Sequence, residues 1–231
     1  MQYNGGKARI ARELAAVISS FQPKVYWEPF CGGANVIQEV KAPIRIGSDA
    51  DIHIISYLQS LQAGWLPPSE ITKVDYDFWK LKVPTVRDEF AMKAIVGYQY
   101  SFAGKFFNGF NCSPRSIGNG RSISEKQAPK LQGIQFQCRT YEKEIPKGTD
   151  LIYCDPPYKG TTKCGSSNYF DSDFFWAWCL ACSLSGIRVL VTEFSAPSFA
   201  TEIWRKEKSQ QLRRSDGSTV MTERLFLVGS L

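Results

Sequence analysis

The most constrained point of this chain is a pair of consecutive prolines, Pro156 and Pro157. They follow the apolar run LIYC at residues 151–154, which predicts a short buried strand. Neither proline can donate a backbone hydrogen bond or continue a sheet, so the chain must turn directly after that strand. In an open α/β sheet, ligands bind at the carboxyl ends of the strands. The residues around this turn are therefore the first candidates for a functional site.

The turn presents three chemical groups. Asp155 brings a carboxylate, Pro156 brings a carbonyl that the following proline cannot pair, and Tyr158 brings an aromatic ring. The carboxylate and the carbonyl offer two acceptors to one amino group, and the ring offers a stacking face to a flat molecule. This combination suits a nucleobase with an exocyclic amine. The alternative is an ordinary polar turn after a strand.

A second candidate site follows the strand predicted at residues 25–27. The segment Glu28–Val36 (EPFCGGANV) contains Gly32 and Gly33, and a helical run to about Lys41 is expected after it. A strand, a glycine turn and a helix in this order are typical of the first crossover of a nucleotide-binding sheet.

The next predicted strand, residues 44–47, leads to Asp49, which lies 17 residues after Gly32. An acidic residue at about this distance, at the end of the second strand, commonly binds the ribose hydroxyls of a nucleotide. An alternative role for Asp49 is to cap the helix predicted at Ile52–Leu61, although Asp51 is the better cap.

Hydrophobic periodicity and turn residues predict the remaining elements. Helices are expected at residues 7–20, 90–100 and 174–184, and strands at residues 131–138 and 187–192. A closing antiparallel hairpin is expected around Asp216-Gly217, with strands at residues 211–215 and 219–228. Residues 64–87, with aromatic residues scattered between prolines and charges, resemble an inserted subdomain.

The net charge of +6 is concentrated in one part of the chain. Residues 101–140 carry six basic residues and one acidic residue, a net charge of +5, whereas residues 141–231 are neutral overall. Aromatic residues lie among the Lys, Arg, Asn and Gly residues of the basic stretch, a pattern that suits contact with phosphates and bases. The alternative is a surface loop without a ligand.

Several other classes of protein are disfavoured. His53 is the only histidine and lies in a segment predicted as a helix, and the seven cysteines lack zinc-like spacing, so no metal site is expected. No run of 18 apolar residues predicts a membrane span, and the N-terminus lacks the pattern of a secretory signal. The cysteines are accordingly expected to be reduced.

Three motifs occur in one order: YNGGK at residues 3–7, EPFCGGANV at 28–36 and DPPY at 155–158. Together they resemble the Dam-like (alpha-group) DNA adenine-N6 methyltransferases, small enzymes of phages and bacteria. The resemblance covers most of the chain and continues through SFAGKFFNGF at 101–110, FD at 170–171, VLVTEFSAP at 189–197 and TERLF at 222–226.

The resemblance implies an α/β architecture with the Rossmann-like fold of methyltransferases that depend on S-adenosyl-L-methionine (SAM). This fold has a mixed seven-stranded sheet whose last strand is antiparallel, and a small inserted target-recognition subdomain is expected beside it. Residues 1–60 and 137–231 would form the SAM-binding catalytic domain, and residues 61–136 the target-recognition insertion.

Position within the motifs also implies site residues. The residues implied in catalysis are Asp155, Pro156, Pro157 and Tyr158. Those implied in SAM binding are Tyr3, Lys7, Glu28, Phe30, Gly32, Gly33, Asp49, Tyr141 and Asp155. Relatives often have an acidic residue before the tyrosine at position 141, whereas this chain has Thr140. The residues expected to bind DNA are Lys105, Phe107, Asn108, Arg115 and Arg121.

The expected activity is site-specific transfer of a methyl group from SAM to the exocyclic N6 amine of a flipped-out adenine in double-stranded DNA, without a metal. Asp155 and the Pro156 carbonyl would accept the amine hydrogens, and Tyr158 would stack on the base. We expect a monomer in the cytoplasm of a bacterial or phage-infected bacterial cell, with a role in DNA methylation and restriction-modification. The alternatives are a cytosine-N4 or RNA base methyltransferase, or a catalytically inactive DNA-binding relative.

Overall fold

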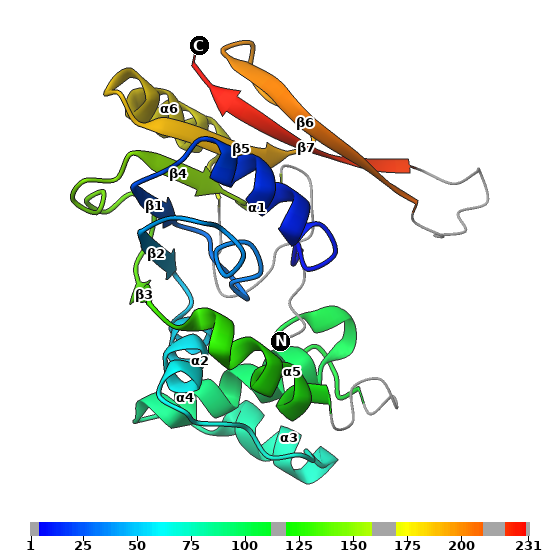
Figure 1. The fold of residues 1–231 in the computed structure, drawn as a ribbon. Coiled ribbons are helices and arrows are strands. Elements are labelled where there is room, and N and C mark those ends of the chain that lie inside the picture. The colour runs from blue at the N-terminus through cyan, green and yellow to red at the C-terminus, as the bar shows by residue number, and fades with distance from the viewer. Residues whose placement is uncertain (1–4, 112–118, 159–169, 210–219, 230–231) are drawn as a thin grey trace.

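The computed structural model describes residues 5–111, 119–158, 170–209 and 220–229 (Figure 1). Its strands are β1 (Val25–Glu28), β2 (Ile44–Asp49), β3 (Ile134–Cys138), β4 (Leu151–Cys154), β5 (Arg188–Glu193), β6 (Ala200–Ser209) and β7 (Val220–Val228). Its α-helices are α1 (Ala11–Ser20), α2 (Ile52–Gln62), α3 (Lys73–Leu81), α4 (Arg87–Ala94), α5 (Asn119–Gln127) and α6 (Ser172–Leu184). Short helical turns are the π-helical η1 (Ile95–Gln99) and the 3₁₀-helical η2 (Phe102–Gly104) and η3 (Ala128–Leu131).

All the strands belong to one seven-stranded sheet with the order β3-β2-β1-β4-β5-β7-β6. Neighbours from β3 to β5 are parallel, whereas β7 runs antiparallel to both β5 and β6. The predicted mixed sheet with a reversed last strand is therefore confirmed. The strand order changes direction between β1 and β4, and such a switch leaves a crevice at the carboxyl ends of the two strands.

Each face of the sheet has its own core, because successive side chains along a strand point to opposite faces. Tyr26 and Tyr153 pack on the face that α1 covers, whereas Trp27 and Ile152 pack on the face that α6 covers. Residues 151–154 are buried throughout, which explains why this strand is a continuous apolar run rather than an alternating pattern.

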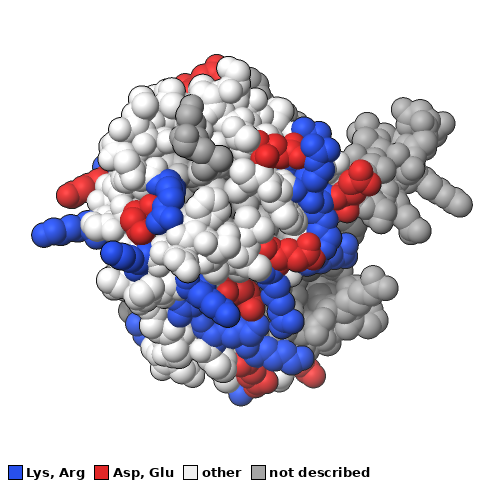
Figure 2. All heavy atoms as spheres, turned by 45° about the horizontal axis from the view of Figure 1, so that its top comes forward, with Lys and Arg blue, Asp and Glu red and all other residues white. Residues whose placement is uncertain are grey.

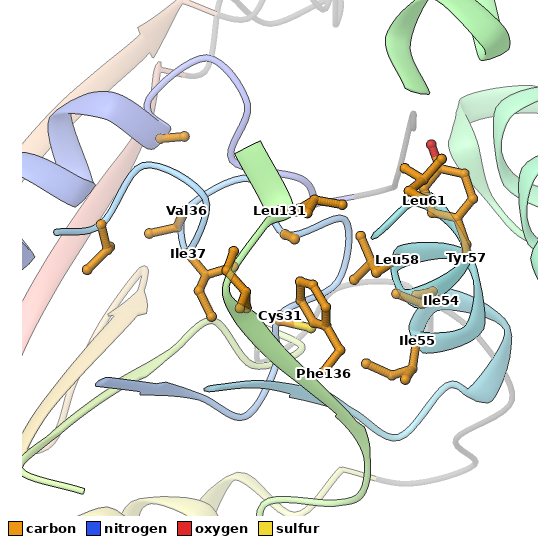
Figure 3. Packing of buried hydrophobic residues seen from close by; sticks show 14 of the residues in the cluster. Cys31, Val36, Ile37, Ile54, Ile55, Tyr57, Leu58, Leu61, Leu131 and Phe136 are labelled. Atoms are coloured by element: carbon orange, nitrogen blue, oxygen red, sulfur yellow. The ribbon is translucent and has the colours of Figure 1, made fainter. Parts of the chain in front are cut away.

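Helices α2 to α5 form a group beside β2 and β3, at the bottom of Figure 1. The core continues into this group, since Ile37 and Phe136 belong to one buried cluster with Ile54 and Leu58 of α2 (Figure 3). The expected division into a catalytic domain and an insertion at residues 61–136 stays a prediction.

The helix predicted between the glycine turn and Lys41 is wrong, and turns occupy this segment instead. Ala34 has a φ of 57°, outside the right-handed helical region, so a regular helix cannot begin at the glycine turn. The N–H of Gln38 does reach the carbonyl of Ala34, but that hydrogen bond is 3.4 Å long. Pro43 then ends the segment, because a proline disfavours helical geometry in the residue before it.

Other elements are shifted from their predicted bounds. Helix α1 begins at Ala11 rather than at residue 7, and the helix predicted at residues 90–100 consists of α4 and η1. The closing pair of antiparallel strands is present, but its first strand, β6, lies earlier in the chain than expected. The strand predicted at residues 211–215 and the Asp216-Gly217 turn lie outside the described residues.

Candidate active site

Three acidic residues lie at the carboxyl ends of neighbouring parallel strands. Glu28 ends β1, Asp49 ends β2, and Asp155 directly follows β4. Strand β1 pairs with both β2 and β4, so the three carboxylates lie at the same edge of the sheet. Burial raises the pKa of Glu28 well above its usual range, and the charges of Asp155 and Asp49 raise it further. The structure thus brings together three predicted site residues that are far apart in the sequence.

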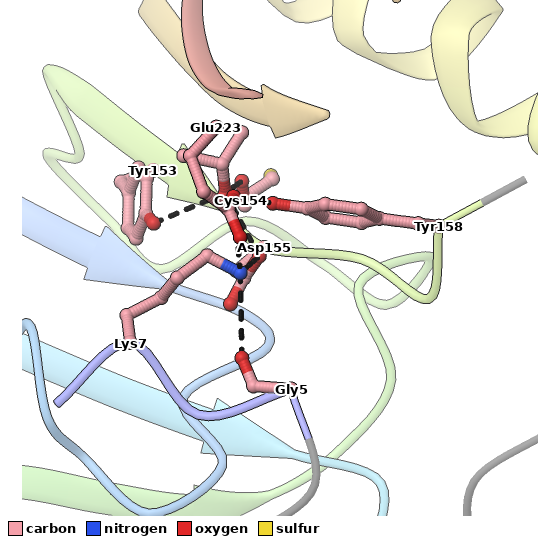
Figure 4. Close-up of polar contacts among 8 residues, drawn as sticks. Gly5, Lys7, Tyr153, Cys154, Asp155, Tyr158 and Glu223 are labelled. Carbon is pink, nitrogen blue, oxygen red and sulfur yellow. Dashed lines mark hydrogen bonds and ion pairs between the residues drawn. The ribbon is translucent and has the colours of Figure 1, made fainter. Parts of the chain in front are cut away.

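Lys7 is the cation of this site, and only 5% of its surface is exposed. Its Nζ lies 2.7 Å from Oδ1 of Asp155 and 3.7 Å from Oε2 of Glu223, and it donates a hydrogen bond to the Gly5 carbonyl at 3.3 Å (Figure 4). The same Nζ lies 4.6 Å from the centroid of the Tyr158 ring. The loop before α1, the turn after β4 and the strand β7 therefore meet at one ammonium group.

A second contact fixes Asp155 from β5. The Thr192 hydroxyl donates to Oδ1 of Asp155 at 2.8 Å and lies 3.1 Å from the Tyr153 hydroxyl. A hydroxyl has a single hydrogen, so a Thr192 that donates to Asp155 accepts from Tyr153. Lys7 and Thr192 therefore both contact the same oxygen of Asp155, Oδ1.

Tyr158 is held through its hydroxyl and its ring. The hydroxyl donates to Oε2 of Glu223 at 2.7 Å, and the ring meets Phe194 edge-on, with centroids 4.6 Å apart and an interplanar angle of 85°. Burial raises the pKa of the Tyr158 hydroxyl well above its usual value, and the charges of Asp155 and Glu223 raise it further. This hydroxyl therefore keeps its proton and acts as a hydrogen-bond donor.

Glu28 is 2% exposed and accepts a hydrogen bond of 2.7 Å from the Tyr26 hydroxyl. Tyr26 lies two residues earlier on the same strand, so its side chain points to the same face of the sheet. This bond satisfies one oxygen of a carboxylate that burial would otherwise penalise strongly.

Asp49 holds the glycine turn against the end of β2. It accepts the backbone N–H of Gly32 and that of Asp51, each at 3.0 Å. Burial raises the pKa of Asp49 to about 6, although the two backbone donors oppose this shift. Asp51 caps α2 by accepting the N–H of His53 at 2.8 Å, which confirms that Asp51 is the better cap.

Phe30 and Tyr141 form an aromatic wall beside the glycine turn. Their ring centroids are 5.2 Å apart, and Phe170 and Phe175 pack against both of them. Tyr141 is 6% exposed, whereas Phe30 is only partly buried. An apolar wall next to carboxylates suits a ligand that has both a flat ring and hydroxyl groups.

Three of the predicted DNA-binding residues lie in the loop after η2. Asn108 is exposed and Lys105 is partly buried. The Phe107 ring is also partly buried, and it packs against the Tyr76 ring with centroids 5.1 Å apart. Phe107 therefore contributes to the core of the helical group, in addition to any contact with a ligand.

Arg121 lies on α5 and makes two local contacts. It pairs with Glu125 at 2.9 Å and donates to the Pro67 carbonyl at 3.3 Å. It also lines a surface cavity of about 470 Å³ together with Trp65 and Trp79.

Two predicted site residues, Tyr3 and Arg115, lie outside the described residues. On the face drawn in Figure 2, basic and acidic side chains are interspersed.

Tyr153, Thr192 and Glu223 also lie at this site, although no local sequence pattern predicts them there. Thr192 and Glu223 lie within the segments VLVTEFSAP and TERLF, but nothing local distinguishes them there. Their role depends on how β5 and β7 align with β4, which a single sequence does not reveal.

The described ranges contain no group of three or more His, Cys, Asp or Glu side chains suited to a metal ion. Their helices include none whose length and hydrophobicity would carry it across a membrane.

The sheet order, the glycine turn after β1 and the acidic residue that ends β2 are typical of a Rossmann-like, nucleotide-binding sheet. A family model, D12 class N6 adenine-specific DNA methyltransferase, matches residues 3–94. The matched segment includes Lys7, the glycine turn and Asp49, and it ends before Asp155.

No curated protein matches the chain. Among solved structures, the chain is similar to the crystal structure of SMU.472, a candidate methyltransferase complexed with SAH, with a TM-score of 0.38 and 9% sequence identity. That similarity covers 100% of this chain and 54% of the other, so this chain spans about half the length of that protein.

Proposed function

We propose that this protein transfers a methyl group from SAM to the exocyclic N6 amine of an adenine in double-stranded DNA. The observation that carries the proposal is the position of Asp155, which follows β4 at the strand switch and is fixed by Lys7 and Thr192. The match of residues 3–94 to the D12 class supports the choice of adenine in DNA as the substrate.

The Asp155 carboxylate suits recognition of an amine. Lys7 and Thr192 both bond Oδ1, so Oδ2 is the oxygen proposed to accept one amine hydrogen. The Pro156 carbonyl would accept the second hydrogen. Two acceptors draw the amine hydrogens to one side and favour a pyramidal nitrogen whose lone pair points away from them. The contribution of these groups is positioning and electrostatic preorganisation.

The residues around the glycine turn fit the cofactor. Asp49 would accept the ribose hydroxyls, and the wall of Phe30 and Tyr141 would contact the adenine ring of SAM. Gly32 has a φ of 45° and Gly33 follows it, so no side chain covers the backbone there. Tyr3, Lys7, Glu28 and Asp155 are proposed to bind the rest of the molecule. When bound, SAM supplies a methyl group already activated by a sulfonium, so the chemistry needs no metal.

The target base must leave the duplex, which costs a few kcal/mol that contacts in the pocket offset. We propose that the base stacks on the Tyr158 ring. Lys105 and Arg121, together with Arg115, would bind phosphates, and Phe107 and Asn108 would lie near the bases. Residues 61–136 are proposed as the segment that reads the target.

A methylation assay tests this proposal. Purified protein is incubated with unmethylated genomic DNA and SAM, the DNA is digested to nucleosides, and methylated bases are quantified by mass spectrometry. We expect N6-methyladenine. N4-methylcytosine, or methylation of RNA alone, would replace the proposed substrate, and loss of all SAM binding would favour a non-enzymatic DNA-binding protein.

Asp155→Ala tests the proposed mechanism. This variant should still bind S-adenosylhomocysteine (SAH) through the proposed contacts of Asp49, Phe30 and Tyr141, but it should lose at least about 100-fold in methylation rate, the range seen when one preorganised polar group is removed. Asp173→Asn, an exposed acid in the first turn of α6, is the matched control and should retain activity. Methylation at the wild-type rate in Asp155→Ala would contradict the mechanism.

A further inference from the structure

Glu223 is an acidic residue in the middle of an antiparallel strand, and only 6% of its surface is exposed. It lies on β7, where its neighbours two and four residues on, Leu225 and Leu227, belong to the core on the α1 side of the sheet. A carboxylate on this face is costly unless polar groups compensate for the loss of water. Its presence there needs a local explanation.

The contacts of Glu223 with Tyr158 and Lys7 supply that explanation. Oε2 accepts the Tyr158 hydroxyl at 2.7 Å and lies 3.7 Å from the Lys7 ammonium. The first contact has the geometry of a strong hydrogen bond to an ionised acceptor, whereas the second is a longer ion pair. Figure 4 shows the Tyr158 hydroxyl pointing at Glu223 from the end of the turn.

We propose that Glu223 is a positioning residue, which acts through the Tyr158 hydroxyl to fix the ring on which the target base stacks. This inference rests on the proposed function. The ring is then fixed at its hydroxyl by Glu223, over one face by Lys7, and by the perpendicular ring of Phe194.

The hydrogen bond between Tyr158 and Glu223 connects the strand switch with the antiparallel end of the sheet. Glu223 belongs to β7 and Tyr158 follows β4, and β5 lies between these strands in the sheet. The backbone of β7 is fixed by its pairing with β5 and β6, including the pair of Glu223 with Lys206. A rigid strand therefore sets the direction in which the Tyr158 hydroxyl points.

Loss of this acceptor should affect methyl transfer more than cofactor binding. A base that stacks on a loosely held ring spends less time aligned for transfer, and a misplacement of about 1 Å can lower a rate by about 100-fold. We expect Glu223→Ala to lower kcat for DNA methylation by about 10- to 100-fold. Its KM for SAM and its dissociation constant for SAH should change by less than about 3-fold, because Lys7, the proposed cofactor residue that Glu223 contacts at 3.7 Å, keeps its shorter pair with Asp155 at 2.7 Å.

A double-mutant cycle separates this role from general damage to the fold. Tyr158→Phe keeps the ring and removes the hydroxyl, so the double variant Glu223→Ala/Tyr158→Phe should be no slower than the slower single variant. Glu223→Gln should recover most of the activity lost in Glu223→Ala, since its amide oxygen can accept the same hydroxyl. Glu207→Ala, an exposed acid on the neighbouring strand β6, is the matched control.

Two results would overturn the inference while leaving the proposed function intact. One is a double variant whose loss in kcat is the product of the two single losses. The other is a Glu223→Gln variant as slow as Glu223→Ala, which would assign the effect to the charge rather than to the hydrogen bond.

The same cycle measured by thermal unfolding reports on the contact without any methylation. The fall in Tm of the double variant should be smaller than the sum of the two single falls, and additive falls would show that the contact contributes nothing. A wild-type protein that methylates no nucleic acid would refute the proposed function and, with it, the positioning role.

Discussion

Burial and hydrogen bonding shift the pKa of Asp49 in opposite directions. Its two backbone hydrogen bonds hold the glycine turn, and yet burial raises its pKa from 3.8 to about 6. A raised pKa means that the folded protein binds a proton that the unfolded chain has already lost. The stability that this group contributes is complete below the unfolded pKa and is lost as the pH rises through about 6.

This sign gives a prediction for Asp49→Asn, whose side chain does not titrate. Between pH 4 and pH 7.5 the free energy of unfolding of the variant should rise relative to that of the wild type, so that the variant becomes relatively more stable by roughly 3 kcal/mol at most, the equivalent of about two pKa units. Denaturant unfolding of both proteins at several pH values measures the difference, and other titrating groups cancel in it. A relative stability that does not depend on pH would refute the assignment.

The positions of residues that follow local sequence signals could be predicted, whereas their roles stay predictions. Asp155 follows an apolar run and precedes two prolines, and Asp49 follows a strand at a fixed distance from Gly32, so both positions could be predicted. Thr192 and Glu223 act on Asp155 and Tyr158 across strands that are distant in the sequence. No pattern within their own strands marks them.

At the scale of elements, Gly47 of β2 allows neighbouring segments to pack closely because it has no side chain. A Cβ atom on Gly47 would lie 2.9 Å from Cε1 of Phe136 and 3.3 Å from Cδ1 of Ile37, closer than atoms in contact normally approach. Glycine therefore lets β3 and the segment after the glycine turn pack directly on this strand.

Gly47→Ala should destabilise the protein by about 1–3 kcal/mol, the usual cost of overpacking a core. Phe136→Leu makes room at the same point, so the double variant should lose less stability than the two single variants together. Urea unfolding of the four proteins measures this coupling. Losses that simply add would mean that the added methyl group is accommodated elsewhere.

The sequence predicts an element well when its backbone keeps one regular geometry, strand or α-helix, over its whole length. The strands β1, β2 and β4 and the helix α6 were predicted close to their observed positions. The predicted helix at residues 90–100 changes to π-helical geometry at η1, and a positive φ at Ala34 prevents the helix expected to follow the glycine turn. Both departures are set by packing with other elements rather than by residue propensity.

At the scale of the whole molecule, the charge distribution bears on the proposed DNA binding. Residues 101–140 hold most of the net charge of the chain, whereas several surface cations elsewhere are paired, such as Lys206 with Glu13 and Lys73 with Asp77. Affinity for DNA should therefore depend on the basic stretch and fall steeply with salt, because each phosphate contact releases counterions.

The double variant Lys105→Ala/Arg121→Ala should weaken DNA binding and reduce the slope of log affinity against log salt by about 1–2. Fluorescence anisotropy with a labelled duplex over a series of salt concentrations measures this slope. Lys206→Ala, which removes a cation paired with Glu13, is the control and should leave the slope unchanged. An unaltered slope in the double variant would place the phosphate contacts on other residues.

The ion pair between Lys7 and Glu223 determines when the site can form during translation. A chain leaves the ribosome from its N-terminal side, so Lys7 emerges 216 residues before Glu223 (223 − 7). Until then β7 cannot join the sheet beside β5, and the ammonium of Lys7 has one of its carboxylate partners missing. Nascent chains in which Glu223 has not yet emerged are therefore expected to lack a finished site, so the site forms late relative to the motif that contains Lys7.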